Sequence, residues 1–215
     1  LKELSEKAPG TFHHSLNVAN LAEAAANEIG ANAMLVRVGA LYHDIGKMVN
    51  PTYFTENQST GINPHDELAP KESAQIIINH VIDGIELAKK NKLPDRVIDF
   101  IRTHHGNSVV YYFYNKQLET NLAFEASDFS YGGPKPFNKE TAILMMCDSV
   151  EAASKSLKDP NSTKINDFVD AIVSKQMDTD QFLNASITLK EIQAIKKVLK
   201  HKLANMYHLR IEYPE

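Results

Sequence analysis

Apolar residues recur at helical spacing along almost the whole length of this 215-residue chain, which favours helices over a sheet. Val18, Ala22, Ala25 and Ile29, for example, fall on one face of a helix. The pattern predicts helices over residues 11–30, 33–45, 71–90, 96–105, 139–157, 165–175 and 189–207. Residues 108–117 fit a short helix and a strand equally well. No repeat, low-complexity tract or flexible linker divides the chain, so we predict one all-α domain over residues 1–215.

Two segments without helical periodicity interrupt this pattern, at residues 49–70 and 120–138. The first contains three prolines and one glycine, the second two of each, and helical periodicity resumes directly on either side of each. We therefore interpret them as long functional loops rather than as domain linkers. We expect Thr11 to cap the first helix, Gly30 to close it and Gly46 to end the second.

Charge and cysteine content narrow the classes of function. The chain has 27 acidic and 23 basic side chains, for a formal net charge of −4, so broad electrostatic capture of polymeric nucleic acid is disfavoured. A small anionic substrate still fits, because a metal ion can outweigh that charge locally. The single cysteine, Cys147, excludes an internal disulfide and suits a reducing compartment. No stretch reaches the roughly 18 apolar residues of a membrane helix, and the start at Leu1 suggests a piece of a longer protein.

Three polar residues stand where the helical pattern calls for apolar ones. Asp148 shares a helix face with Met145 and Ala152, and His80 and His14 also lie on predicted buried faces. A buried carboxylate needs a cation or strong hydrogen-bond donors nearby. A lone buried histidine or aspartate is most often a hydrogen-bonded core residue, so none of the three carries a functional interpretation alone.

Two dipeptides strengthen the case for metal chemistry. His43-Asp44 closes one predicted helix, and His104-His105 closes another. Neighbouring helical residues point about 100° apart, so each pair can bind two metal ions or two sides of one metal centre. Imidazole nitrogens and carboxylate oxygens suit manganese, iron or zinc. The full set exceeds one ion's needs but suits two that share a carboxylate: His14, His43, Asp44, His80, His104, His105 and Asp148.

The order of these residues resembles the HD-domain metal-dependent phosphohydrolases, a superfamily named for a His-Asp pair such as His43-Asp44. The added His80 and His104-His105 are similar to the branch that cleaves cyclic dinucleotides. The cyclic di-GMP enzymes of that branch carry a Gly-Tyr-Pro motif after the double histidine. Here Gly106-Asn107-Ser108 follows His105 and no Gly-Tyr-Pro occurs, which argues against cyclic di-GMP as substrate.

A more specific resemblance is to the cytoplasmic HD domain of the seven-transmembrane PgpH-type cyclic di-AMP phosphodiesterases. It covers nearly the whole chain. The matching stretches are Pro9-Gly10-Thr11, His14-Ser15, Tyr42 to Lys47, Tyr53 to Gln58, Asn63 to Asp66, His104-His105-Gly106, Tyr131 to Pro136 and Tyr207 to Ile211. The resemblance implies a domain at the cytoplasmic face of a bacterial membrane, cyclic di-AMP as substrate and linear pApA as product. It leaves the oligomeric state open.

By this resemblance, His14, His43, Asp44 and Asp148 hold one divalent ion, and Asp44 bridges to a second held by His80, His104 and His105. His13 competes with His14, which we favour because Ser15 follows it and its helical face is apolar. Manganese and iron suit this set best, and zinc also fits. Two such ions generate a bridging hydroxide that attacks the phosphodiester.

Further residues are candidates for contacts with the substrate. Lys47, placed just beyond the predicted helix end, could contact a phosphate or assist the leaving group, although a solvated helix-end charge is an equally good interpretation. Arg102 and Lys135 are weaker candidates for the same role. Tyr131 could stack on an adenine, and His65 could lie at the rim of the site.

Three rival functions share parts of this pattern. A di-iron HD-type oxygenase assembles similar ligands to activate O₂. A single-metal HD nucleotidase needs neither His80 nor the His104-His105 pair. A non-catalytic HD module would bind a nucleotide and signal, but such modules lose ligands, whereas every position is filled here.

Overall fold

The computed structural model describes residues 1–58, 61–120 and 122–207, and within these residues it confirms the all-α prediction. The α-helices are α1 (Lys2–Lys7), α2 (Pro9–Glu28), α3 (Ala33–Tyr42), α4 (Pro70–Lys90), α5 (Asp95–Thr103), α6 (Tyr111–Glu119), α7 (Lys139–Ser154), α8 (Ser162–Asp178) and α9 (Leu189–Met206). Short 3₁₀ turns are η1 (Ile45–Met48), η2 (Pro51–Tyr53), η3 (Thr55–Asn57), η4 (Pro64–Glu67) and η5 (Ala126–Phe129). No helix in the described residues is long and apolar enough to cross a membrane.

Several predicted boundaries were wrong at helix ends. Helix α1 was not predicted, and α2 begins at Pro9, where a first-turn proline loses no hydrogen bond. Thr11 therefore lies inside the first turn and caps nothing, and its backbone N–H donates to Asn57 Oδ1 at 3.1 Å. Of the two alternatives for residues 108–117, the structure shows a helix, because most of this segment lies in α6. The motif from Tyr207 to Ile211 falls beyond the described residues from His208 onward.

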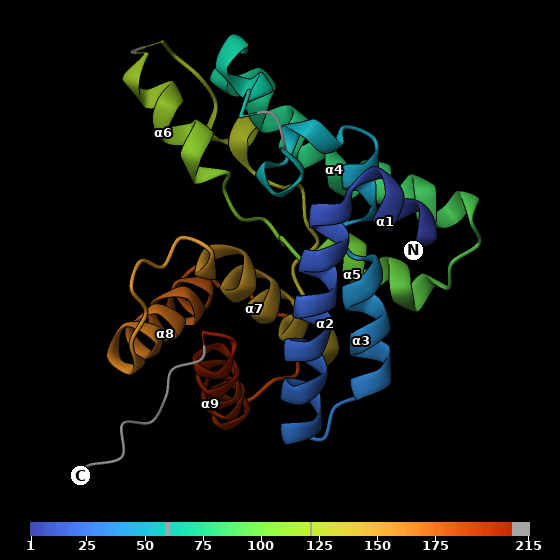
Figure 1. Ribbon diagram of the computed structural model, residues 1–215, viewed down its shortest axis with the longest axis vertical. Helices are drawn as coiled ribbons and strands as arrows, with labels where there is room; N and C mark the ends of the chain where they lie inside the picture. The colour runs from blue at the N-terminus through green and yellow to red at the C-terminus, as the bar shows by residue number, and fades with distance from the viewer. Residues whose placement is uncertain (59–60, 121, 208–215) are drawn as a thin grey trace.

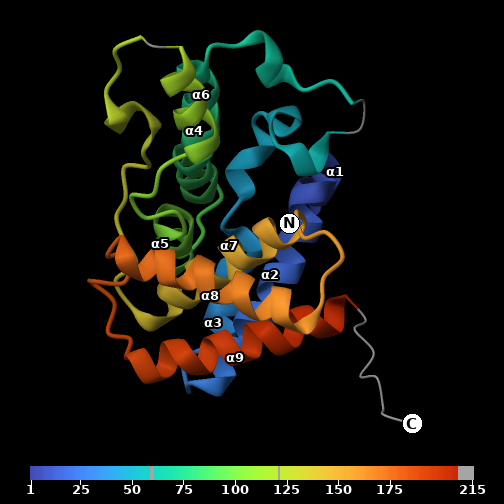
Figure 2. The same cartoon turned by 90° about the vertical axis from the view of Figure 1, so that its left-hand side faces the viewer.

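Helix α7 is the centre of the main hydrophobic core. Its residues are buried on nearly all sides, as expected for a helix that is apolar all round. It packs against α2, α3, α5, α8 and α9, and its Asp148 is thereby carried to the middle of the molecule. Helices α2 and α3 lie side by side next to it in Figure 1, and α8 and α9 cover another face in Figure 2.

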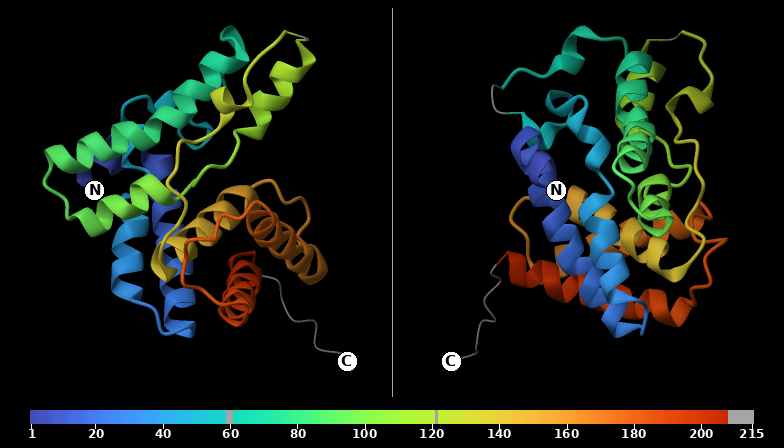
Figure 3. Two further views of the ribbon diagram at one scale, coloured as in Figure 1. Left: turned by 180° about the vertical axis from the view of Figure 1, so that it is seen from behind. Right: turned by 90° about the vertical axis from the view of Figure 1, so that its right-hand side faces the viewer.

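Helices α4 and α6 form a separate arm with their own small apolar cluster. They lie side by side at the upper end of Figure 1, and the view from behind in Figure 3 shows α4 next to α5. Phe113 of α6 and Phe129 of η5 pack there against Ala74 of α4. The site described below lies where α4 meets α2, α3, α5 and α7.

Gly46 lets helix α4 approach the turn that follows α3. The predicted helix over residues 33–45 ends earlier, at Tyr42, and Gly46 lies in η1 without a left-handed backbone, so it does not end a helix as expected. A Cβ atom on Gly46 would lie 1.8 Å from the backbone oxygen of His80 and 2.5 Å from the backbone nitrogen of Gly84. The glycine is required by this close approach of two backbones.

Replacing Gly46 by alanine should therefore force α4 away from η1. We expect G46A to lower the free energy of unfolding by about 1–3 kcal/mol, the usual cost of overpacking. Urea denaturation followed by circular dichroism measures this. G132A is the matched control, because no atom lies within 4 Å of the Cβ position at Gly132. Equal stability of the two variants would contradict this account of Gly46.

Candidate metal centre

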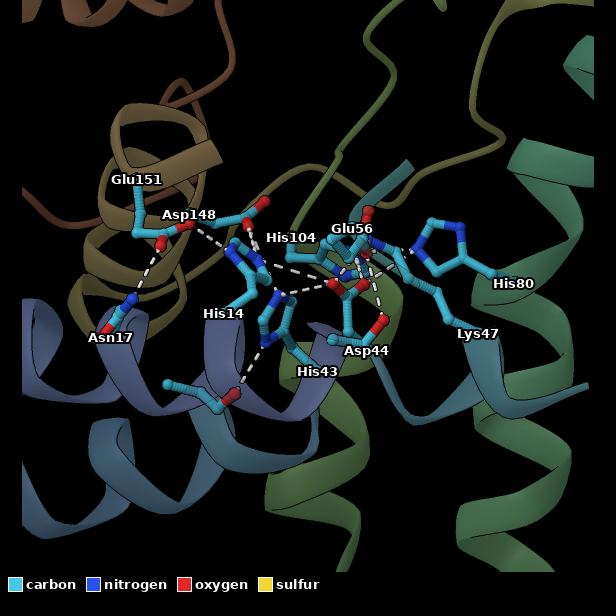
Figure 4. A network of polar contacts seen from close by, with 12 residues as sticks. His14, Asn17, His43, Asp44, Lys47, Glu56, His80, His104, Asp148 and Glu151 are labelled. Atoms are coloured by element: carbon cyan, nitrogen blue, oxygen red, sulfur yellow. Dashed lines mark hydrogen bonds and ion pairs between the residues drawn. The ribbon is translucent and has the colours of Figure 1, made fainter. Parts of the chain in front are cut away.

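Five segments bring all the predicted ligands to one place. His14 comes from α2, His43 and Asp44 from the turn after α3, His80 from α4, His104 and His105 from the end of α5, and Asp148 from α7. All are buried except His105, which is half-buried. Figure 4 shows six of these side chains pointing toward a common centre.

Asp44 lies between two groups of imidazoles and faces each with a different oxygen. Its Oδ2 lies 3.3 Å from Nε2 of His43 and 3.6 Å from Nε2 of His14. Its Oδ1 lies 3.3 Å from Nε2 of His80 and 3.5 Å from Nε2 of His104. This is the geometry required of a carboxylate that serves two centres at once.

A second carboxylate and a third imidazole complete the two groups. Asp148 Oδ1 lies 2.9 Å from His14 Nε2 and 3.4 Å from His43 Nε2. On the other side, His105 joins His80 and His104, with ligand atoms all within 4.8 Å of one another. One group therefore contains two carboxylates, and the other relies mainly on imidazoles.

Backbone carbonyls fix the orientation of three histidine rings. Nδ1 of His43 lies 2.7 Å from the carbonyl oxygen of Ala40, and Nδ1 of His104 lies 2.7 Å from that of Ile101. Nδ1 of His80 makes the same contact with Ile77. A carbonyl only accepts, so each Nδ1 carries a proton and each neutral ring presents the lone pair of Nε2 to the centre.

The nitrogen and oxygen atoms that face the centre are better placed to bind a cation than to form hydrogen bonds with one another. Among the described residues, His43 Nε2 and Asp44 Oδ1 are buried without a hydrogen-bond partner. Nε2 of His80 and Nε2 of His104 lie 3.1 Å apart, although neither neutral ring has a proton to share there. A cation satisfies all of these atoms, so the cluster has the donor set and the geometry of a divalent-metal site.

The charges of the cluster favour the same interpretation. Burial would raise the pKa of Asp44 and of Asp148, but the facing histidines hold both pKa values well below the ordinary range. Burial would also lower the pKa of His43, but Asp44 and Asp148 raise that pKa to about 10. The same two carboxylates that favour positive charge at His43 would favour a divalent cation bound at its Nε2. Burial lowers the pKa of His105, which keeps this ligand neutral.

Lys47 and Glu56 form an ion-pair network beside Asp44. Lys47 Nζ lies 2.8 Å from Asp44 Oδ2 and 2.9 Å from Glu56 Oε1. Glu56 also accepts a hydrogen bond from the hydroxyl of Thr11 at 3.1 Å. Burial would lower the pKa of Lys47, but the two carboxylates raise it, so the side chain stays charged. The network holds the Lys47 ammonium group at the wall of a cavity of about 310 Å³, which is also lined by Asp44, His105 and Asp148.

Sequence reasoning missed two residues that hold this site together. Glu56 anchors Lys47, as described above. Glu151, which is buried, contacts Nδ1 of His14 with Oε2 and accepts a hydrogen bond from Asn17 at 3.0 Å with Oε1. Its position was detectable, because Glu151 follows Asp148 by three residues and so shares its helix face.

Three of the residues predicted to contact the substrate have contacts of different kinds. Tyr131 is buried and stacks on His105, with ring centroids 4.2 Å apart, so it packs on a predicted ligand. Arg102 pairs with Asp99 at 2.6 Å and shares a small cavity with His105. Lys135 lies 3.5 Å from the carbonyl oxygen of Thr179.

Two other histidines considered from the sequence, His65 and His13, are not among the clustered ligands. Nε2 of His65 contacts the carbonyl oxygen of Tyr53 at 2.9 Å, and its ring packs on Phe113. His13 is exposed, whereas His14 points into the cluster.

Comparison with known proteins places this cluster in a family. The family model described as HD domain matches residues 11–153. Over all 215 residues the chain is 49% identical to "Cyclic-di-AMP phosphodiesterase PgpH" of Listeria monocytogenes serotype 1/2a (strain 10403S). It is 45% identical over 215 residues to the protein of the same name in Bacillus subtilis (strain 168). In both comparisons it spans 30% of the length of the relative.

A solved structure matches the fold as well. The crystal structure of the L. monocytogenes phosphodiesterase PgpH HD domain in complex with cyclic di-AMP has a TM-score of 0.93 and 48% sequence identity, and the match covers 99% of this chain and 98% of that one. The resemblance predicted from the sequence is thereby confirmed. The chain belongs to the HD domain family, as its sequence, its helical fold and its cluster of histidines and aspartates agree.

Proposed function

We propose that this chain hydrolyses a 3′–5′ phosphodiester bond of cyclic di-AMP to give linear pApA. The placement of Asp44, with one carboxylate oxygen toward each group of imidazoles, is the observation that carries the proposal. The names of the relatives and the cyclic di-AMP complex of a 48% identical domain support the choice of substrate.

The proposed cofactors are two divalent ions, manganese or iron. His14, His43, Asp44 and Asp148 would hold one, and Asp44 would be shared with a second at His80, His104 and His105. Bound ions of this kind supply a nucleophilic water near neutral pH and positive charge against the phosphodiester. By analogy with its relatives, the chain would be the HD domain of a longer, membrane-anchored protein, at the cytoplasmic face of the membrane.

The protein's own residues prepare the site for this reaction. The i−3 carbonyls hold the imidazole lone pairs in place before any ligand arrives, so little reorganisation remains to be done. Lys47 keeps a fixed positive charge at the cavity wall, where it can contact a phosphate oxygen or the leaving oxygen. Burial of these side chains lowers the local dielectric constant, which strengthens each of these interactions.

The first test is a product assay with and without chelator. The purified chain with Mn²⁺ should convert cyclic di-AMP to pApA, resolved by chromatography, and EDTA should abolish the conversion. Cyclic di-GMP should be cleaved more slowly. Uptake of O₂ with a small organic substrate, while both dinucleotides stay intact, would favour the rival oxygenase instead.

Replacing Asp44 by alanine removes the carboxylate that faces both groups. We expect D44A to lower turnover of cyclic di-AMP by at least about 100-fold, because charge stabilisation at both centres is lost. Elemental analysis should show less bound metal, and circular dichroism should show that the helices remain. H201A, at an exposed position on α9, is the control. Turnover near that of the wild type in D44A would rule out the shared-carboxylate arrangement.

Glu151 should tune the affinity of one ion without contacting it. We expect E151Q to weaken metal binding by about 10–100-fold at the His14 group, because partners that orient a ligating histidine usually have effects of this size. Competition with a fluorescent chelator measures the affinity of each site. E86Q is the matched control, since Glu86 is exposed on α4. Identical binding curves for E151Q and E86Q would remove Glu151 from the site.

A further inference from the structure

Four of the five clustered histidines have a hydrogen-bond acceptor behind the ring. In three of them Nδ1 faces the carbonyl oxygen of the residue three positions earlier, and Nδ1 of His14 faces Glu151. Within the part of the chain that the structure describes, His105 is the one clustered histidine without such an acceptor. The orientation of its ring must therefore be fixed by another kind of contact.

The ring of Tyr131 supplies that contact. It stacks on His105 with ring centroids 4.2 Å apart and an angle of 21° between the planes. It also meets the ring of His80 edge-on, with centroids 6.1 Å apart and an angle of 83°. Aromatic pairs are favourable in both arrangements, and Tyr131 is buried. One side chain thus packs on two of the three imidazoles of this group.

The backbone holds Tyr131 beside the turn that follows His105. The N–H of Tyr131 donates to the carbonyl oxygen of Ser108 at 2.9 Å, and the N–H of Ser108 donates to that of His105 at 3.0 Å. Two residues before Tyr131, the side chain of Phe129 is fully buried in the small apolar cluster of α4 and α6. The position of the Tyr131 ring is therefore fixed from both sides.

The group that contains His105 is also the more accessible of the two. Every ligand of the group around Asp148 is buried, whereas His105 is half-buried and lines three cavities. A half-buried imidazole without a hydrogen bond behind it can turn to another rotamer unless its neighbours prevent this. The affinity of this group for an ion should therefore depend on the contact with Tyr131.

We propose that Tyr131 is a positioning residue for the second metal ion, and that its ring, stacked on His105, takes the place of the acceptor that orients each other clustered histidine. This inference rests on the proposed function, because it requires the second ion at His80, His104 and His105. Partners that orient a ligating histidine raise metal affinity without touching the ion. The aromatic face of Tyr131 is what the assignment requires, and its hydroxyl group is not.

The test measures Mn²⁺ binding to Y131L and Y131F by competition with a fluorescent chelator. The binding step that H105A weakens identifies the second ion. We expect Y131L to weaken this step about 10-fold and to leave the other step unchanged, because leucine fills space without an aromatic face. Y131F keeps the ring and should bind both ions as the wild type does. Y112L is the matched control, since Tyr112 is an exposed tyrosine on α6.

Activity gives a second readout that a purely structural role would not produce. At low Mn²⁺ concentration, Y131L should convert cyclic di-AMP more slowly than the wild type. Raising the Mn²⁺ concentration about 10-fold should restore turnover, because the lost affinity is then offset by mass action. Turnover that stays low at saturating Mn²⁺ would contradict a role in ion binding.

The outcomes separate this assignment from the proposed function. If the wild type binds only one Mn²⁺ per chain, the two-ion proposal fails and the assignment falls with it. If the wild type binds two ions but leaves cyclic di-AMP intact, the proposed reaction fails, and the binding data still decide on Tyr131. Unchanged binding in Y131L, equal losses at both steps, or a loss in Y131F would each overturn the assignment alone.

A further measurement needs no variant at Tyr131 and covers the case in which Y131L does not fold. In the metal-free wild type, proton NMR should show a nuclear Overhauser effect between the rings of Tyr131 and His105. The ring protons of His105 should also be shifted upfield by the ring current of Tyr131. Absence of both signals would show that the stack does not orient His105 before metal binds, which would overturn the assignment.

Discussion

The buried carboxylate of Asp44 is the constraint on which the rest of the structure depends. It lies between two groups of imidazoles, and each oxygen faces a different group. Burying a carboxylate in such a place destabilises the folded protein unless positive charge surrounds it, because the carboxylate loses its hydration. Lys47 supplies part of that charge, and the donor set around it suits divalent ions for the remainder. The helices that supply His14, His80, His104 and Asp148 must therefore converge on this one residue.

The core explains how a polar cluster is kept in a helical protein. Helix α7 is apolar all round and packs on several neighbours, so Asp148 and Glu151 are buried with it. The i−3 carbonyls and Glu151 accept from the outer nitrogens of the histidines, which leaves the inner nitrogens for ligands. Gly46 permits the close approach of its backbone to that of α4, and Gly106 leaves room for the side chain of Gln181.

Two cavities with different linings adjoin the ligand cluster, and His105 lines both. One is lined by Asp44, Lys47 and Asp148, and its positive charge on Lys47 suits an anionic phosphodiester. The other extends from His105 along α7 and α8, with apolar walls and the amide of Gln176.

The sequence by itself determined the helical class, most helix positions and the identity of the clustered side chains, because period and residue chemistry are local properties. His14, His80 and Asp148 were identifiable as polar residues on apolar faces. Only the tertiary structure decided that Thr11 binds Asn57 and caps nothing, that Gly46 permits contact with α4, and that His65 contacts the carbonyl oxygen of Tyr53. It also revealed the ion pair of Glu56 with Lys47 and the contact of Glu151 with His14. These depend on contacts between segments distant in sequence, which no local pattern encodes.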